Sequence, residues 1–201
     1  MAGSQWLLCA DGEWPPESIW KPLSEACGVI VGVDGGTDAA LSRNLTVTMA
    51  TGDFDSITDT RVERIALPNQ NSSDLEKSLQ YAAENGAEIV KIVGVEGGEI
   101  DHQLAAFAAL VEAPSELEIS MHMTEHIVMR CLGDLEIILD EGATLSLFAF
   151  TACASVSISG VEFPLEEEPL AFSTRGLHNV ALGGPIHIQS DGALVVVISG
   201  H

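Results

Sequence analysis

The chain has 201 residues, with 8 Lys or Arg against 30 Asp or Glu, and a formal net charge of −22 at pH 7. A field of this sign repels phosphate backbones and argues against a nucleic-acid-binding protein. Because 46% of the residues are hydrophobic, the chain can build a sizeable core and is not expected to be disordered.

The apolar segments do not indicate a membrane protein. One of the longest, 193–198, is far shorter than the roughly 20 residues that a spanning helix needs. Residues 1–14 carry no basic segment ahead of their apolar stretch, so no secretory signal is expected and the prediction is a cytoplasmic protein. The cysteines lack Cys-x-x-Cys spacing and lie in or beside apolar segments, which predicts buried, reduced thiols: Cys9, Cys27, Cys131 and Cys153.

The first part of the chain alternates strand-like runs with helical patterns. The runs, rich in β-branched residues, are 6–10, 29–34, 46–53 and 88–95. This alternation predicts a mostly parallel, Rossmann-like α/β domain over residues 1–122.

Two helices are predicted within this domain. A capping-box pattern, Ser73 to Glu76, begins a helix over 73–84. A second helix follows Gly97-Gly98 and ends near Pro114, with an apolar stripe that includes Ile100 and Leu104.

The last part of the chain consists of short strand-like runs separated by Gly, Asp and Pro, from LEISMHM at 117–123 to ALVVVIS at 193–199. Many short strands with close turns predict an all-β sandwich domain over residues 123–201.

Carboxylates follow the predicted strands of the α/β domain. Asp34 leads into a loop of Gly35, Gly36 and Thr37, whose glycines permit close backbone approach to a ligand. Asp53 and Asp55 are two residues apart, a spacing that puts both carboxylates on one side of an extended segment.

Two further acids, Asp74 and Asp101, fall in the first turns of the two predicted helices. Each acid alone has a simpler interpretation as a helix cap or turn residue. Together with Asp34, Asp53 and Asp55, they are expected to converge on one edge of the sheet. Like charges held close together there need a cation to stabilise them, and carboxylate oxygens are ligands that suit Mg²⁺. Gly97 and Gly98 precede a helix N-terminus that can bind phosphate, and the chain has no P-loop motif, so the sequence predicts a magnesium–nucleotide site of another kind.

The order and spacing of the segments VGVDGGT (31–37), GDFDSIT (52–58), SDLEKSL (73–79) and GVEGGEIDHQLA (94–105) resemble those of thiamine pyrophosphokinases. The resemblance continues in SGVEFPL (159–165) and LHN (177–179).

This resemblance implies an enzyme that transfers the diphosphate of ATP to the hydroxyl of thiamine and releases AMP. It implies an α/β domain that binds ATP and Mg²⁺, a β-sandwich domain that helps to bind thiamine, and a homodimer with sites at its interface. Carried over by position, the roles are metal binding for Asp53, Asp55, Asp74 and Asp101, with Asp74 and Asp101 also catalytic; ATP binding for Asp34, Gly35, Gly36, Thr37, Gly97, Gly98 and His102; and thiamine binding for Gln70, His178 and Asn179.

The chain departs from the family pattern at several motif positions. Glu99 stands in place of an Arg, Glu162 in place of a Lys, Asn71 in place of an Asp and His178 in place of a Ser. Loss of both basic side chains leaves three hypotheses open. Another basic residue binds the phosphates, and the available ones are Lys77, Arg130 and Arg175. Alternatively, the acceptor is another small alcohol, or the protein binds thiamine or nucleotide without turnover.

Overall fold

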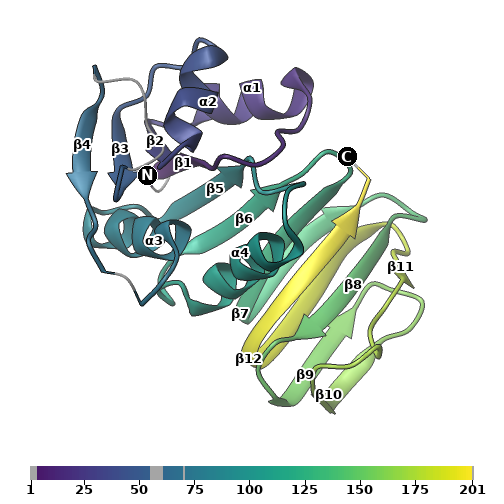
Figure 1. The fold of residues 1–201 in the computed structure, drawn as a ribbon. Helices are drawn as coiled ribbons and strands as arrows, with labels where there is room; N and C mark the ends of the chain where they lie inside the picture. Colours follow the sequence, from purple (N-terminus) through teal and green to yellow (C-terminus); the bar gives the residue numbers. More distant parts are fainter. Residues whose placement is uncertain (1–3, 55–60, 70, 201) are drawn as a thin grey trace. The chain divides into compact units, whose positions relative to one another are not determined.

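The computed structural model describes residues 4–54, 61–69 and 71–200 (Figure 1). The chain divides into two compact units, Met1–Thr124 and Glu125–His201. Both helices and strands are present, so the predicted mixed α/β architecture is confirmed. Among the described residues, no helix is both long enough and apolar enough to span a membrane.

A parallel sheet forms the centre of the first unit. In the described part of the chain its strands pair in the order β6-β5-β1-β2-β3-β4, every pair parallel. Strands β1, β2 and β5 are almost wholly buried, as expected of a parallel sheet covered on both faces. The bounds are β1 (Gln5–Cys9), β2 (Val29–Val33), β3 (Met49–Gly52), β4 (Glu63–Ala66), β5 (Ile89–Val93) and β6 (Glu118–His122).

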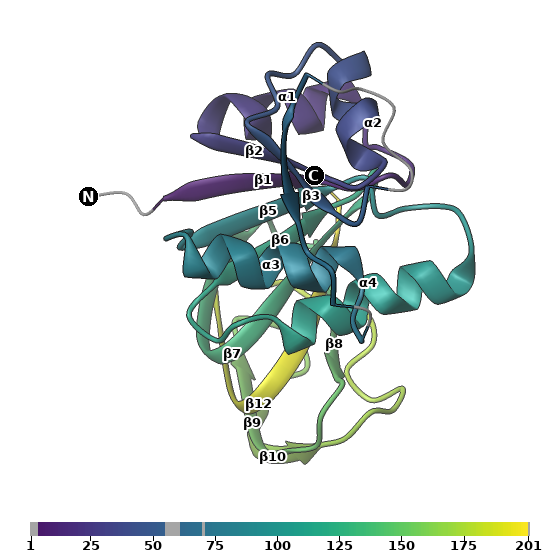
Figure 2. The ribbon, with the colours of Figure 1, turned by 60° about the vertical axis from the view of Figure 1, so that its left-hand side comes forward.

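Helices cover both faces of this sheet. Figure 2 shows α1 (Glu17–Ala26) and α2 (Gly36–Ser42) on one face, with α3 (Asp74–Glu84) and α4 (Ile100–Glu112) on the other. The chain first adds strands on one side of β1, in the order β2, β3 and β4, and then adds β5 and β6 on its other side. The helices change face because the direction in which strands are added reverses. Sheets of this kind bind ligands outside the carboxyl ends of the strands where the direction reverses, which here lies at β1 and β5.

The helix predictions have mixed outcomes. Helix α3 is confirmed, and the Ser73 hydroxyl caps it by accepting from Glu76 N at 3.2 Å. The α4 stripe is wrong, since Ile100 and Leu104 are 68% and 58% exposed. Small residues let this helix pack closely, so its buried side chains are Ala106, Ala109 and Leu110.

Three elements of the first unit were not predicted from the sequence: α1, α2 and β4. Gly36 and Thr37, predicted as loop, belong to α2, whose seven residues are too few to show a clear helical period. Strand β4 has a mostly exposed burial pattern and therefore lacks the apolar run that identified the other strands.

Long antiparallel strands form the second unit. The predicted runs at 126–132 and 135–140 form one strand, β7, and those at 187–189 and 193–199 form another, β12. These two strands pair along most of their length, with a register shift between Ser190 and Leu194. Around that shift, β12 changes its second neighbour from β9 to β8. The bounds are β7 (His126–Leu139), β8 (Thr144–Ala149), β9 (Cys153–Ser159), β10 (Leu165–Leu170), β11 (Asn179–Val180) and β12 (Gly184–Ser199).

Alternating residues of these strands build one apolar core. Leu145, Leu147 and Ala149 of β8 belong to the same buried cluster as Val156 and Ile158 of β9, all at most 2% exposed. The period of two follows from the pleat of the strand, which sends successive side chains to opposite faces.

The four cysteines are free thiols, and Cys9, Cys131 and Cys153 are buried while Cys27 is partly buried. Burial raises the pKa of the Cys131 thiol from 9.0 to about 12, with smaller contributions from Asp134 and Cys153. Burial also raises the pKa values of Cys9 and Cys27. Neutral, buried thiols of this kind are unreactive.

The raised pKa of Cys131 predicts a loss of stability in alkali. Between pH 9 and about 12 the unfolded thiol ionises while the folded thiol stays protonated, so rising pH favours unfolding across that window. The free energy of unfolding of the wild type, measured in urea, is expected to fall by up to about 1.4 kcal/mol per pH unit because of this thiol. Cys131→Ala should show a shallower decline between pH 9 and 10, and equal slopes would refute the assignment.

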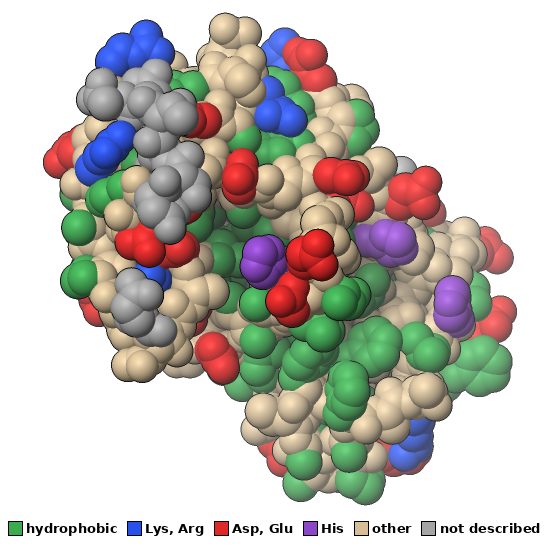
Figure 3. Space-filling view, in the orientation of Figure 1, with side chains coloured by type: hydrophobic (Ala, Val, Ile, Leu, Met, Phe, Trp, Pro, Cys, Tyr) green, Lys and Arg blue, Asp and Glu red, His purple; other side chains and the backbone are tan. Residues whose placement is uncertain are grey.

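The excess of acids predicts that salt stabilises the protein. Figure 3 shows acidic side chains spread over the face in view with few basic ones between them. Raising NaCl from about 0.01 to 1 M shortens the Debye length from about 30 to 3 Å and weakens repulsion within the net charge of −22. We expect the melting temperature to rise with NaCl in calorimetry; a flat or falling profile would contradict the prediction that repulsion among the acids destabilises the fold.

Candidate functional site

A pocket of about 420 Å³ lies in the first unit at the carboxyl ends of β1, β2 and β5. Its position is the crevice expected where the strand order of the sheet reverses. Three strand-to-helix connections line it, together with the start of α3 and the first two turns of α4: Ala10, Asp11, Gly12, Val33, Asp34, Gly35, Ser73, Asp74, Leu75, Gly94, Val95, Glu96, Gly97, Gly98, His102, Gln103, Ala105 and Ala106.

Main-chain atoms form part of the wall of this pocket, because two of its glycines, Gly12 and Gly94, sit against neighbouring backbone. A Cβ on Gly94 would lie 2.2 Å from the carbonyl oxygen of Ala10, and one on Gly12 would lie 2.6 Å from that of Gly94. Gly12 N donates to Gly94 O at 2.7 Å, which joins the connections that follow β1 and β5. Side chains at these positions would force the two connections apart.

Three carboxylates gather at one side of the site. Asp34 follows β2, Asp53 follows β3 and Asp74 is the first residue of α3. Each offers one oxygen, and these oxygens all lie within 4.8 Å of one another, with Asp34 and Asp74 partly buried and Asp53 exposed. We call these three residues the acid cluster. Like charges at this separation repel one another, so a cation bound among them would stabilise the arrangement.

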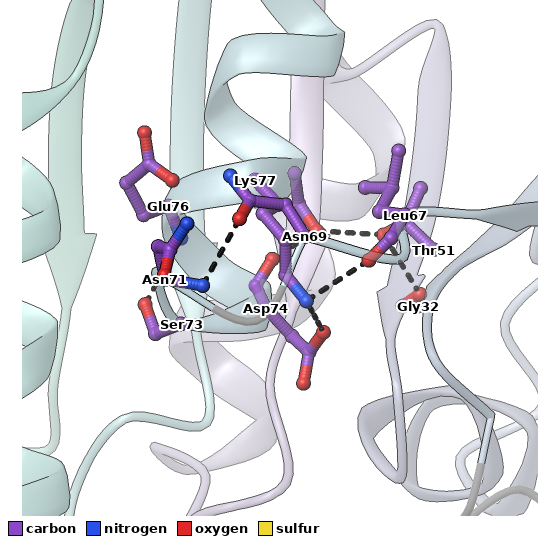
Figure 4. Close-up of polar contacts among 10 residues, drawn as sticks. Gly32, Thr51, Leu67, Asn69, Asn71, Ser73, Asp74, Glu76 and Lys77 are labelled. Atoms are coloured by element: carbon purple, nitrogen blue, oxygen red, sulfur yellow. Dashed lines mark hydrogen bonds and ion pairs between the residues drawn. The ribbon is translucent and has the colours of Figure 1, made fainter.

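A buried polar network positions the elements that carry the acid cluster. The Ser78 hydroxyl lies 2.6 Å from Asp74 O and donates to it, so its oxygen accepts from the Thr51 hydroxyl at 2.7 Å. Thr51 Oγ1 also lies 3.4 Å from Gly32 O, and Asp34 N donates to Thr51 O at 2.8 Å. Figure 4 shows the contacts among Gly32, Thr51, Asp74 and their neighbours. This role of Thr51 and Ser78 was not predicted from the sequence, although both hydroxyls lie in otherwise apolar patterns.

Lys77 lies beside the acid cluster and is only 8% exposed. Its Nζ lies 2.7 Å from Asp74 Oδ1, an ion-pair distance without the geometry of a hydrogen bond, and donates to Leu67 O at 3.0 Å. Leu67 N in turn donates to Gly52 O at 3.0 Å, next to Asp53. Lys77 therefore links α3, through Leu67, to the end of β3 beside Asp53.

The remaining sequence-predicted residues of the first unit are distributed around this site. His102, Gly97 and Gly98 line the pocket. Asp101 lies in the first turn of α4, is exposed, and accepts from its own neighbour, His102 N, at 2.9 Å. It is not one of the three acids that cluster among the described residues.

Other predicted positions stand apart from the pocket. Gly36 and Thr37 are buried in α2, and Thr37 is 0% exposed, whereas Asp34 and Gly35 of the same connection line the pocket. Asp55 and Gln70 lie outside the described residues.

The two residues predicted to bind thiamine that the structure describes lie in the second unit. His178 is exposed, has φ +52°, and donates its N–H to Ser146 Oγ at 3.1 Å. Asn179 is 7% exposed, and its amide bonds the backbone of Phe163 twice, at 2.7 and 3.0 Å. Asn179, Phe163 and Leu177 line a separate pocket of about 260 Å³. The amide of Asn179 therefore holds the wall of this pocket in place.

The basic residues considered as phosphate partners have structural contacts. Arg175 forms an ion pair with Glu168 and lies in the second unit, and Arg130 is buried in β7. A further basic residue, Arg64 on β4, was not among the predicted candidates. Its guanidinium lies 5.4 Å from the centroid of the ring of Phe54, the residue that follows Asp53. Glu99 is the exposed N-cap of α4 and makes no capping bond with its side chain.

These features define an α/β protein whose parallel sheet carries an acidic, glycine-walled ligand crevice at its switch point. A family model described as the thiamin pyrophosphokinase catalytic domain matches residues 20–122. The thiamine pyrophosphokinase of Bacillus subtilis (strain 168) is 30% identical over an alignment of 148 positions, which covers 67% of this chain and 69% of that protein. The chain belongs to the thiamin pyrophosphokinase family, as its motifs predicted.

Solved structures support the same fold. The crystal structure of thiamine pyrophosphokinase from Bacillus subtilis superimposes with a TM-score of 0.83 at 21% identity, covering 98% of this chain and 99% of that one. Thiamin pyrophosphokinase from Candida albicans gives 0.79 at 14% identity, covering 99% and 90%.

Proposed function

We propose that the protein is a thiamine diphosphokinase, which transfers the β,γ-diphosphate of ATP to the hydroxyl of thiamine. An O–P bond forms at the β-phosphorus, the bond from that phosphorus to the α-phosphate oxygen breaks, and AMP leaves. The observation that carries this proposal is the acid cluster beside a glycine-walled pocket, in a chain of the thiamin pyrophosphokinase family.

The pocket residues suit a polyphosphate. Gly97 and Gly98 precede α4, so backbone N–H groups at the start of a 13-residue helix are available for phosphate oxygens. Gly35 leaves room for the close approach of a nucleotide, and His102 lines the same wall. In this proposal these residues bind and orient ATP, and transfer depends mainly on positioning and charge stabilisation.

The acid cluster fits Mg²⁺, because its donors are all carboxylate oxygens that lie close together. In this proposal Asp34, Asp53 and Asp74 hold the ion, with Asp55 and Asp101 as further candidates from the sequence. A bound Mg²⁺ would neutralise the negative charge on the phosphates. Asp74 is the residue we assign to orient the thiamine hydroxyl and accept its proton, since Ser73 and Ser78 fix the start of its helix.

The second unit completes the proposal. We assign the arrangement of a Rossmann-like ATP domain followed by a β-sandwich that helps to bind thiamine. The candidate thiamine contacts are His178 and Asn179 of the second unit, and Gln70, which precedes α3 in the sequence. The proposed assembly is a homodimer in the cytoplasm, where the free, buried thiols would stay reduced. Light scattering coupled to size-exclusion chromatography measures the assembly directly, and a monomeric mass would remove the dimer from the proposal.

The acceptor is open to a second candidate, another small alcohol. The observation that favours it is Glu162 and His178, both exposed, at motif positions where the resemblance leads us to expect Lys and Ser. A panel of alcohols with AMP formation as the readout separates the two candidates.

The direct test is to incubate the purified protein with ATP, Mg²⁺ and thiamine, and to measure AMP and thiamine diphosphate. AMP should form only when thiamine is present, in equal amount to thiamine diphosphate. Nucleotide or thiamine binding without any AMP, over a wide range of NaCl and Mg²⁺, would support the non-catalytic hypothesis instead.

A further inference from the structure

We propose that Lys77 is an internal counter-ion that sets how tightly the acid cluster binds a divalent cation. The inference rests on the metal site of the proposed function and concerns a residue to which that function gives no role. It starts from an unusual position for a lysine: the side chain is 8% exposed, although lysines are almost never buried unless paired.

The contacts of Lys77 explain how a charge is stable there. Its Nζ pairs with Asp74 Oδ1 at 2.7 Å and donates to Leu67 O at 3.0 Å. Figure 4 shows Lys77 between these two partners. The ion pair places one positive charge directly against a cluster of three carboxylates. The lysine therefore offsets part of the repulsion among the acids when no metal is bound.

The same charge opposes a metal ion. A divalent cation held by the acid cluster would share Asp74 with the ammonium, and two cations on one carboxylate lie within a few ångströms. At an effective dielectric constant of about 20, their repulsion exceeds the thermal energy several-fold. Loss of the lysine charge is therefore expected to strengthen metal binding.

A competing effect is that Lys77 also orients Asp74. This effect is smaller here, because other bonds already fix the start of α3: the Ser73 cap and the bond from the Ser78 hydroxyl to Asp74 O. The charge effect should therefore decide the direction of the change.

The test measures binding of Mn²⁺, an oxygen-seeking stand-in for Mg²⁺, from the electron paramagnetic resonance signal of the free ion. Lys77→Met should lower the Mn²⁺ dissociation constant by about tenfold, while Lys77→Arg, which keeps the charge, should stay within about twofold of wild type. Lys77→Gln keeps an N–H donor for Leu67 O without the charge, so it should behave like Lys77→Met and replaces it if that variant does not fold. Lys21→Met is the matched control, because Lys21 forms an exposed ion pair with Glu17 on another helix.

Thermal unfolding gives a second readout. In EDTA, Lys77→Met should melt several degrees below wild type, and saturating Mg²⁺ should raise its melting temperature more than it raises that of wild type. Unchanged or weaker Mn²⁺ binding in both neutral variants would overturn the inference.

The outcomes also separate this inference from the proposed function. Mn²⁺ binding that tightens in the variants, in a protein that forms no AMP, would support the counter-ion and reject the diphosphokinase. If the wild type forms AMP but the neutral Lys77 variants bind Mn²⁺ no more tightly than it does, the diphosphokinase is supported and the counter-ion is rejected. If the wild type binds no Mn²⁺, the metal site and the counter-ion both fall.

Discussion

Asp74→Asn is expected to lower kcat/KM for thiamine-dependent AMP formation by about a thousandfold, the usual size of a general-base contribution combined with lost charge stabilisation. The amide keeps the shape of the side chain but cannot take up the hydroxyl proton at neutral pH. It also removes one of the three negative charges of the acid cluster. Asp74 is the first residue of α3, so the change leaves the Ser73 cap intact.

The control for this prediction is Glu84→Gln, which makes the same chemical change at the other, exposed end of the same helix. It should retain wild-type activity. Asp74→Asn removes the negative charge that pairs with the buried Lys77, so the variant is expected to be less stable. The melting temperature of the variant should therefore be measured, and the assay should be run well below that temperature. Activity within about tenfold of wild type would remove Asp74 from the catalytic role and leave it as a structural acid.

Gly94→Ala is expected to destabilise the protein by roughly 3–5 kcal/mol, the sum of left-handed backbone strain and a clash in a packed region. Gly94 has φ +78°, and an added Cβ would lie 2.2 Å from Ala10 O and 2.6 Å from Trp14 Nε1. Trp14 Nε1 donates to Ala10 O at 3.1 Å, so the new methyl group would also disturb this bond. For a chain of this size the melting temperature should fall by about 6–20 °C.

Two other glycines separate the strain from the clash. Gly86 has φ +85°, and an added Cβ there would meet nothing within 4 Å, so Gly86→Ala carries only the backbone strain. Gly28 has neither a positive φ nor a near neighbour, so Gly28→Ala should leave stability almost unchanged. Urea unfolding should rank the variants Gly94, Gly86 and Gly28 from most to least destabilised. Equal effects at Gly94 and Gly86 would show that the connections around the pocket yield at little cost.

The sequence predicted those parts of the fold that local patterns encode. The buried strands of the first unit and the capped helix α3 have strong apolar runs or a specific cap, and both were found. Helix α2 is short and begins with glycine, and β4 is an edge strand with exposed side chains, so neither has such a signal. Two predicted strands form the single strand β12 because both parts pair with β7 on either side of the register shift. This pairing joins residues far apart in the sequence, so a short sequence segment does not reveal it.

The candidate site was predictable in its acids and glycines and not in its supporting contacts. Asp34, Asp53 and Asp74 follow strands or begin a helix, so the topology of a parallel sheet brings them to one edge. The pairing of Lys77 with Asp74 is only a spacing of three residues in the sequence, typical of exposed helix pairs. Its burial, and the approach of Leu67 and Thr51 to the same helix, come from the three-dimensional packing.

The backbone wall of the pocket has a consequence for how this protein tolerates sequence drift. Peptide N–H groups and carbonyl oxygens are the same in every protein, so a wall made from them keeps its polar groups whatever happens to side chains elsewhere. The surface can therefore move to a net charge of −22 without altering that part of the crevice. The positions at which a substitution would disrupt this wall are instead Gly12 and Gly94, where even the smallest added side chain would meet a backbone oxygen at 2.6 and 2.2 Å.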